Sequence, residues 1–267
     1  MQRSKRDTQG FVAGSLIGTL GGLIGLGGAE FRLPVLVGLF RLPTLEAVIL
    51  NKAMSLVVVA TAFAFRIKSI PIAELSLHWD VILNLLAGSL IGAWWAAGHA
   101  LTMSKVWLNR IIMVLLVALA ILMLSEAFLG FHDKTTELIA PGVARIIAGL
   151  IAGLGIGMIA ALLGVAGGEL LIPTIVLLYG LDIKLAGSLS LAVSFPTMIV
   201  GFARYSNSNA FSILRKESSL FRWMVAGSIL GAGIGGLLLG IVPSHLLISV
   251  LGGILLISAI KTFKHAH

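Results

Sequence analysis

The sequence has no cysteine and few charged side chains. The chain of 267 residues contains no cysteine, which excludes structural disulfides and thiol chemistry. Only 11% of its residues are charged, whereas soluble domains carry roughly 25%. So few polar side chains cannot cover a globule in water, and 58% of the residues are hydrophobic. Apolar windows long enough to cross a bilayer recur along the chain, which predicts one all-α, polytopic integral membrane domain.

Acidic residues are also fewer than basic ones. The net charge is 19 − 11 = +8, and a basic chain can bind nucleic acid. Here the basic side chains lie mainly at the ends of apolar segments, where membrane topology requires them. We therefore predict the bilayer, and no nucleic acid, as a partner. The start, MQRSKRDTQGFVAGSLIG, imitates a signal peptide, but it matches an internal segment and is predicted to be a retained first helix.

A glycine-rich stretch occurs twice in the chain. GLGGAEFRLP, from Gly25, aligns with GVAGGELLIP, from Gly164, at an offset of 164 − 25 = 139. The pairs that align at this offset include Gly14 and Gly153, Gly18 and Gly157, Gly28 and Gly167, Glu30 and Glu169, Pro34 and Pro173, Ser55 and Ser194, and Gly92 and Gly231. No gap is needed over most of a half-chain, so we predict two homologous repeats.

Each repeat is predicted to contain five helical elements, the first of which ends at the glycine-rich break. The predicted elements span about 10–26, 30–41, 45–66, 80–101 and 105–128 in the first half, and about 141–165, 169–180, 184–204, 220–241 and 244–263 in the second. The chain is thereby divided into a first transmembrane repeat (1–129), a linker (130–140) and a second transmembrane repeat (141–267).

The number of crossings decides how the repeats are related. If the first two elements together return the chain to its starting side, three crossings follow and the repeats have inverted topology. A parallel plan requires the first element to cross and the second to re-enter without crossing. The distribution of basic residues favours the inverted plan, with both termini in the cytoplasm.

The two breaks are predicted to line a substrate cavity. Irregular backbone at membrane depth must be buried in protein or line a cavity. The short helix after each break begins there with unpaired N–H groups and the positive end of its dipole, which hold anions. Glycine also lets the backbone approach a ligand closely. Facing N-termini would bind an anion, with Gly27, Gly28, Gly167 and Gly168 as backbone contacts.

Glu30 and Glu169 have two interpretations. Each falls in the first turn of its short helix, where a carboxylate stabilises the N-terminus. Intramembrane carboxylates also serve as proton relays, which makes proton coupling the alternative. Arg32 can pair with Glu30, but its counterpart is Leu171, so this charge lies outside the repeated pattern. Snorkelling toward an interface and attraction of the substrate are its two remaining interpretations.

The next helix of each half offers polar groups to the same cavity. LNKAMS contains Asn51 and Lys52, and LSLAVS contains Ser190 and Ser194. Because an uncompensated lysine in an apolar helix is costly, Lys52 is predicted to face the cavity and bind an anion or a carboxylate. An ion pair with Glu46 is the structural alternative. The neutral side chains suit hydrogen bonding to an oxyanion, and small polar residues also hold helices together.

Other chemistry finds no support in the residue patterns. The histidines have no metal-ligand spacing, and no GK[ST] follows the glycine-rich runs as it does in phosphate loops. No nucleophile–base signature marks a catalytic centre. We therefore predict that the protein is not an enzyme and has no cofactor and no metal site.

At these residues the sequence resembles the sulfite exporter TauE/SafE family of bacterial membrane permeases. The likeness covers nearly the whole chain and is carried by GLGGAEFRLPVL with LNKAMS, and by GVAGGELLIPTIV with LSLAVS. Ala29 and Ala166 depart from the family's glycine pattern. The resemblance implies a multi-pass protein of the bacterial cytoplasmic membrane that moves sulfite, sulfonates or related organic anions.

The breaks and the resemblance together predict a secondary transporter for a small sulfur-containing oxyanion. Alternating access about a central site is the expected mechanism, with a proton as the candidate coupling ion. A passive anion channel and a non-transporting membrane subunit are the alternatives. The predicted partners are the anion and the bilayer, and a homo-oligomer is compatible with the sequence.

Overall fold

Helices are the only regular elements in the part of the chain that the computed structural model describes, which comprises residues 2–24, 28–66, 77–129, 140–237, 249 and 252–260. The helices of the first half are α1 (Gln2–Ile24), α2 (Ala29–Gly38), α3 (Thr44–Arg66), α5 (Trp79–Thr102) and α6 (Lys105–Leu129). Those of the second half are α7 (Val143–Leu163), α8 (Gly168–Tyr179), α9 (Ile183–Tyr205), η2 (Asn209–Ser212), α10 (Ile213–Lys216) and α11 (Ser218–Leu237), followed by helical residues at 252–260.

The predicted helix positions agree closely with these bounds. The largest difference is at the start, where α1 begins at Gln2 and not near residue 10. The polar residues there are held against the second half, because Arg6 donates to Glu217 at 2.8 Å and Asp7 accepts from Ser219 at 2.8 Å. The short turns η2 and α10 were not predicted. Gly25, Gly27 and nearly all of the predicted linker 130–140 lie outside the described residues, as do the parts of the last two predicted elements at 238–241, 244–248, 250–251 and 261–263.

Five of the described helices are long and apolar enough to cross a membrane, namely α3, α5, α6, α7 and α9. A helix needs about 20 mostly apolar residues to span the hydrocarbon core. The prediction of an all-α, multi-pass membrane protein is confirmed.

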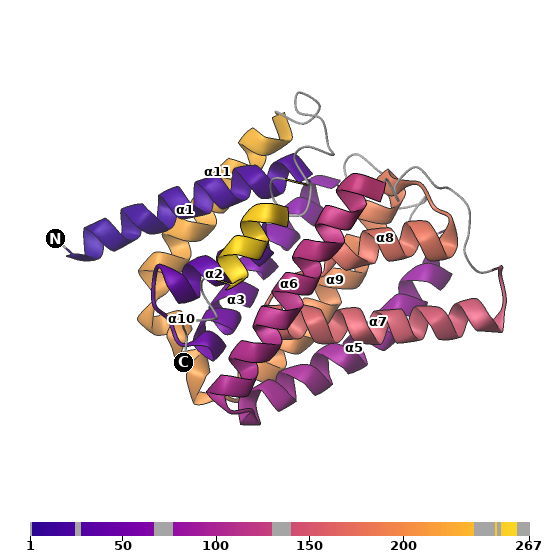
Figure 1. The fold of residues 1–267 in the computed structure, drawn as a ribbon, viewed down its shortest axis with the longest axis horizontal. Helices are drawn as coiled ribbons and strands as arrows, with labels where there is room; N and C mark the ends of the chain where they lie inside the picture. The colour runs from indigo at the N-terminus through magenta and orange to yellow at the C-terminus, as the bar shows by residue number, and fades with distance from the viewer. Residues whose placement is uncertain are drawn as a thin grey trace.

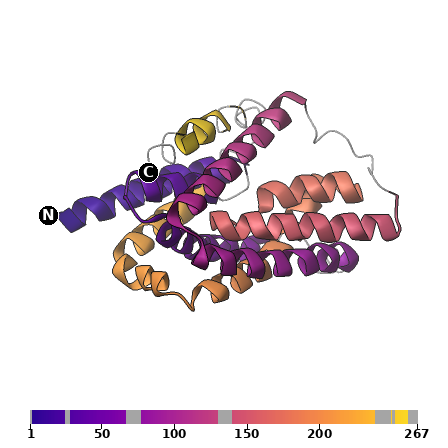
Figure 2. The same cartoon turned by 60° about the horizontal axis from the view of Figure 1, so that its bottom comes forward.

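Two pairs of long helices pack lengthwise, α1 along α11 and α5 along α7 (Figures 1 and 2). The interior helices join these pairs, since α3 contacts both α9 and α11, and α9 also contacts α5. The two short helices occupy similar places, because α2 packs against α1 and α3, and α8 packs against α7 and α9.

Both lengthwise pairs meet at glycines, which allow the backbones to approach closely. On one side Gly14 and Gly18 of α1 lie against the backbone of Met224 and Ser228 of α11, and on the other Gly153 and Gly157 of α7 lie against the backbone of Leu85 and Ser89 of α5. The second contact contains the residues related to the first by the offset of 139 (14 + 139 = 153, 18 + 139 = 157, 224 − 139 = 85 and 228 − 139 = 89). The two halves therefore make equivalent contacts with each other.

A cation–π contact repeats in the same way. The guanidinium carbon of Arg6 lies 5.8 Å from the ring centroid of Phe40, and that of Arg145 lies 5.5 Å from the ring centroid of Tyr179. These residues are again 139 apart (6 + 139 = 145 and 40 + 139 = 179). The contact ties the start of the first helix of each half to the end of its short helix.

The contacts between α5 and α9 give the relative direction of these two helices. The hydroxyls of Ser89 and Thr197 are 2.7 Å apart, and further along both helices Gly98 lies against the side chain of Arg204. Because the residue numbers rise together along the contact, α5 and α9 run in the same direction.

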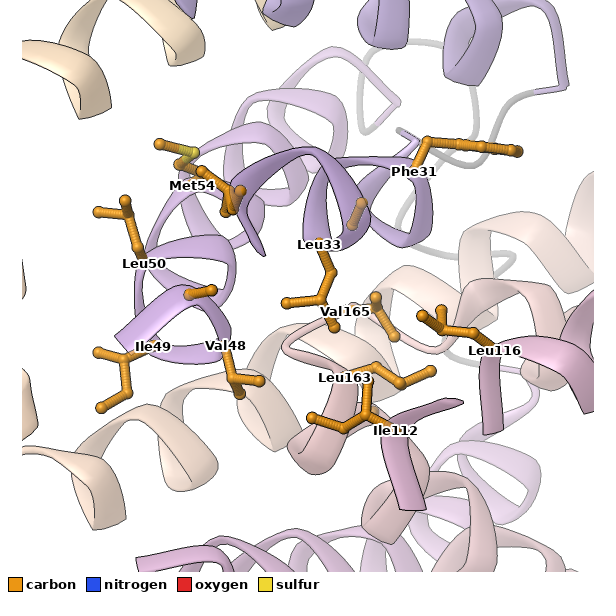
Figure 3. Packing of buried hydrophobic residues seen from close by; sticks show 14 of the residues in the cluster. Phe31, Leu33, Val48, Ile49, Leu50, Met54, Ile112, Leu116, Leu163 and Val165 are labelled. Carbon is orange, nitrogen blue, oxygen red and sulfur yellow. The ribbon is translucent and has the colours of Figure 1, made fainter. Parts of the chain in front are cut away.

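The largest buried apolar cluster surrounds the point where α2 meets the end of α7. Leu33 of α2 points toward Leu163 and Val165, and Ile112 and Leu116 of α6 approach the same cluster (Figure 3). In lipid such packing is driven by close van der Waals contact, because lipid tails are as apolar as leucine. The cluster fixes α2 and the end of α7 against α6.

Replacing Gly157 by alanine is expected to destabilise the protein. The added Cβ would fall on the carbonyl oxygen of Ser89, and relief of the clash requires α5 and α7 to separate. Overpacking of this kind typically costs about 1–3 kcal/mol. Gly155→Ala, in the same helix, is the control, because its Cβ would meet nothing within 4 Å. Thermal unfolding in detergent, followed by circular dichroism, measures both variants, and equal midpoints would contradict the expectation.

Candidate functional site

Both short helices begin after a glycine with left-handed backbone. Gly28 precedes α2 with φ 68°, and Gly167 precedes α8 with φ 82°. Gly164, which ends α7, has φ 67°, and a Cβ there would also fall on the carbonyl oxygen of Val48 in α3. Side chains other than glycine rarely adopt this conformation. The glycines therefore end one helix and start the next, as predicted.

Four side chains from α3 and α9 cover the carbonyl oxygens at the end of α7. Lys52 Nζ donates to Ala160 O (3.1 Å), Tyr205 OH to Ala161 O (3.1 Å), Asn51 Nδ2 to Leu163 O (3.1 Å) and Ser55 Oγ to Gly164 O (3.2 Å). The last carbonyl groups of a helix lack intrahelical partners and form the negative end of its dipole. The Lys52 ammonium thus lies where a cation is favoured.

Asn51 also joins the two breaks. Its Nδ2 donates both to Leu163 O at the end of α7 and to Ala29 O at the start of α2, the latter at 3.0 Å. Asn51 is fully buried, and its Oδ1 has no hydrogen-bond partner among the described residues. One amide group therefore holds the first and second breaks side by side.

Arg32 lies in the first turn of α2 and is 0% exposed, which contradicts the interpretation that it snorkels to an interface. Its Nη2 donates to Ser55 Oγ at 2.9 Å, while Nε and Nη1 have no partner in the described part of the chain. No carboxylate in the described part of the chain lies within 4 Å of the Arg32 guanidinium. Glu30 and Arg32 interact electrostatically, but they do not form a direct ion pair.

Glu30 and Glu169 approach each other from the starts of α2 and α8. Both side chains are buried, and their carboxyl groups lie close enough to interact electrostatically. Within the described residues, neither oxygen of Glu30 nor Oε1 of Glu169 makes a hydrogen bond of ordinary geometry. The two helix N-termini therefore face each other across a pair of carboxyl groups.

Unpaired buried polar atoms are concentrated at these breaks. In the described structure they include atoms of Glu30, Arg32, Asn51 and Glu169. Buried polar groups are nearly always hydrogen-bonded in proteins, so a cluster of unpaired donors and acceptors marks a place suited to a polar ligand. Both signs of charge are represented in the cluster.

Comparison with protein families identifies the chain. The family model described as sulfite exporter TauE/SafE matches residues 10–262. The chain belongs to this family. Comparisons with curated proteins and with solved structures give no match. The TauE/SafE family comprises membrane transporters of sulfite and related anions, so an anionic substrate and a place in the bilayer follow from the membership.

In this TauE/SafE protein both departures from the glycine pattern are buried. Ala29 provides the carbonyl oxygen that accepts from Asn51, and Ala166 packs in a cluster with Val59 and Met198. The two methyl groups therefore occupy packed positions at the breaks.

The remaining predicted residues have varied surroundings. Ser190 donates to Gly187 O of its own helix at 2.9 Å, whereas the Ser194 hydroxyl is buried without a partner in the described residues. Gly168 is the first residue of α8, and Gly27 lies outside the described residues. Lys52 bonds to a backbone carbonyl and not to Glu46.

Two residues that contribute to the site were not predicted. Tyr205 is fully buried with its hydroxyl on Ala161 O. Gly201 of α9 leaves room for Lys52, because a Cβ there would lie 2.8 Å from Lys52 Cε. A buried tyrosine in an apolar helix needs a hydrogen-bond partner for its hydroxyl. The position of Tyr205 in such a helix is therefore a sequence signal that could have identified it. Nothing in the local sequence distinguishes Gly201 from other helix-packing glycines.

Proposed function

We propose that this TauE/SafE protein is a secondary carrier for a small sulfur-containing oxyanion, such as sulfite or a sulfonate, in the bacterial cytoplasmic membrane. The observation that carries the proposal is the joining of the two breaks, with the starts of α2 and α8 facing each other and buried ionisable groups left unpaired. Helix N-termini attract anions. Lys52 adds a positive charge next to the same breaks.

We further propose that residues 1–129 and 141–267 are inverted repeats with both termini in the cytoplasm. The shared direction of α5 and α9 supports this plan. In parallel repeats α9 would run in the same direction as its counterpart α3, and α5, which crosses directly after α3, would run in the opposite direction. The equivalent glycine contacts between the halves, and the equivalent cation–π contact within each half, support the repeat itself. Inverted repeats carry substrate by rocking about a central site.

Burial favours a carrier over a passive channel. Glu30, Arg32, Asn51 and Lys52 are each fully buried, and a conducting pore would expose the groups that line it. An occluded site is one state of an alternating-access cycle. A non-transporting subunit has no need for unpaired charged groups at its centre.

Flux through purified protein in liposomes tests the proposal. Radiolabelled sulfite is expected to enter protein-containing liposomes with saturable kinetics and to exchange with internal unlabelled sulfite, because a carrier binds its substrate on each side in turn. Empty liposomes measure leakage, and taurine and acetate test the choice of anion. Absence of both flux and binding for all these anions would contradict the transport proposal, and large unitary currents in planar bilayers would favour a channel.

A further inference from the structure

The repeat leaves two charged groups at the breaks unexplained, namely Lys52, whose counterpart is Leu191, and Arg32. The counterpart of Arg32 is Leu171, which is buried and apolar. A buried guanidinium is costly unless it is paired with a counter-charge and its donors are satisfied. The protein nevertheless keeps Arg32 fully buried in the first turn of α2.

The guanidinium reaches from the first break to the second. Nη2 donates to Ser55 Oγ, and the Ser55 hydroxyl in turn donates to Gly164 O at the end of α7. These bonds hold the planar group in one position and occupy one of its three nitrogens. Nε and Nη1 keep donors that no described residue accepts.

The other buried cation is placed differently. Lys52 Nζ donates to Ala160 O, at the negative end of the α7 dipole. A backbone partner of this kind already compensates the ammonium group in part. Arg32 lies at the opposite kind of helix end, the positive start of α2, where a cation is unfavourable. The neighbouring Glu30 carboxyl interacts with it electrostatically, but it accepts no hydrogen bond from Nε or Nη1.

We propose that Arg32 binds the oxyanion group of the transported substrate directly, through Nε and Nη1. The proposal rests on the function proposed above and names the residue that recognises the anion. A guanidinium forms strong charge-assisted hydrogen bonds to the oxygens of sulfite, sulfonates and carboxylates. Because Leu171 stands at the equivalent position in the second half, the anion binds on the α2 side of the two breaks.

Arg32→Leu is the variant that tests this role, since it installs the residue of the second half. An incompletely paired buried charge is costly, and leucine removes that cost with an apolar side chain, so the variant is expected to fold. Sulfite binding to purified full-length protein, measured by calorimetry, is expected to weaken about tenfold or more, the scale of a lost charge-assisted bond. Arg32→Lys keeps the charge but loses the planar donors, and an intermediate loss is expected.

Arg222→Leu is the matched control, because it removes the same charge from an exposed position in α11. Thermal unfolding without ligand provides a second readout. A purely structural role lowers the midpoint of Arg32→Leu without ligand and leaves the shift caused by sulfite unchanged. A ligand-binding role reduces that shift at the same sulfite concentration.

The outcomes separate this proposal from the function on which it rests. If wild-type protein binds sulfite and both Arg32→Leu and Arg32→Lys bind it equally well, the role of Arg32 is wrong and the carrier proposal stands. If wild-type protein binds none of sulfite, taurine and acetate, the carrier proposal fails. Should Arg32→Leu not fold, undiminished binding by Arg32→Lys overturns the role of the guanidinium, and an intermediate loss supports it.

Discussion

Replacing Lys52 by glutamine is expected to reduce sulfite flux into liposomes about 100-fold. Two unit charges 4 Å apart interact by about 4 kcal/mol at an effective dielectric constant of 20, and each 1.4 kcal/mol corresponds to roughly a factor of ten. An anion bound at the breaks would therefore lose a large part of its stabilisation when the ammonium is removed. Glutamine keeps a neutral N–H donor on a side chain that is one bond shorter, so the variant removes the charge but not the donor.

The controls for this prediction separate charge from stability. Lys105→Gln removes the same charge from an exposed position at the start of α6 and is expected to leave flux unchanged. Lys52→Met also removes the donor to Ala160 O and is expected to lower the unfolding midpoint further than Lys52→Gln. Wild-type flux in Lys52→Gln, together with a lowered midpoint in Lys52→Met, would show that Lys52 only caps α7.

The positions of the helices and of the breaks follow from local features of the sequence. A long apolar window indicates a crossing helix. Glycines with left-handed backbone, Gly28 (φ 68°), Gly164 (φ 67°) and Gly167 (φ 82°), stand where one helix ends and another begins. The early start of α1 could not be predicted from periodicity, because Arg6 is held there by Glu217, which is 211 residues away.

The partners inside the candidate site were harder to predict for a related reason. Asn51 and Lys52 stand out as polar residues in an apolar helix, and both are at the breaks. Their partners are backbone carbonyl groups of α7 and, for Asn51, also of Ala29 in α2. Every residue carries such a group, and no sequence pattern marks it. The sequence therefore indicates which side chains need compensation inside the membrane, while the packing of α3 on α7 decides what provides it.

Glu30→Gln and Glu169→Gln are each expected to abolish the response of sulfite flux to an imposed pH gradient, while exchange of sulfite across the membrane persists. We propose that the facing carboxyl groups hold the coupling proton between them, and a glutamine amide cannot take up or release a proton. Flux in liposomes with and without a pH gradient, measured alongside exchange at equal pH, tests both halves of the prediction. Glu46→Gln is the matched control, because Glu46 also lies in the first turn of a helix, α3.

Non-additivity distinguishes proton coupling from stabilisation of helix ends. If the two carboxyl groups act as one proton site, the double variant loses no more coupling than either single variant. If they only stabilise the starts of α2 and α8, each change costs about 0.3–1 kcal/mol of stability, the costs add, and the response to the pH gradient survives. The opposition of the two N-termini makes the first outcome the expected one, because the two buried carboxyl groups interact with each other and cannot both be ionised without repulsion. Retention of full coupling in either single variant would remove the pair from the transport mechanism and leave the carboxyl groups as charges that stabilise two buried helix ends.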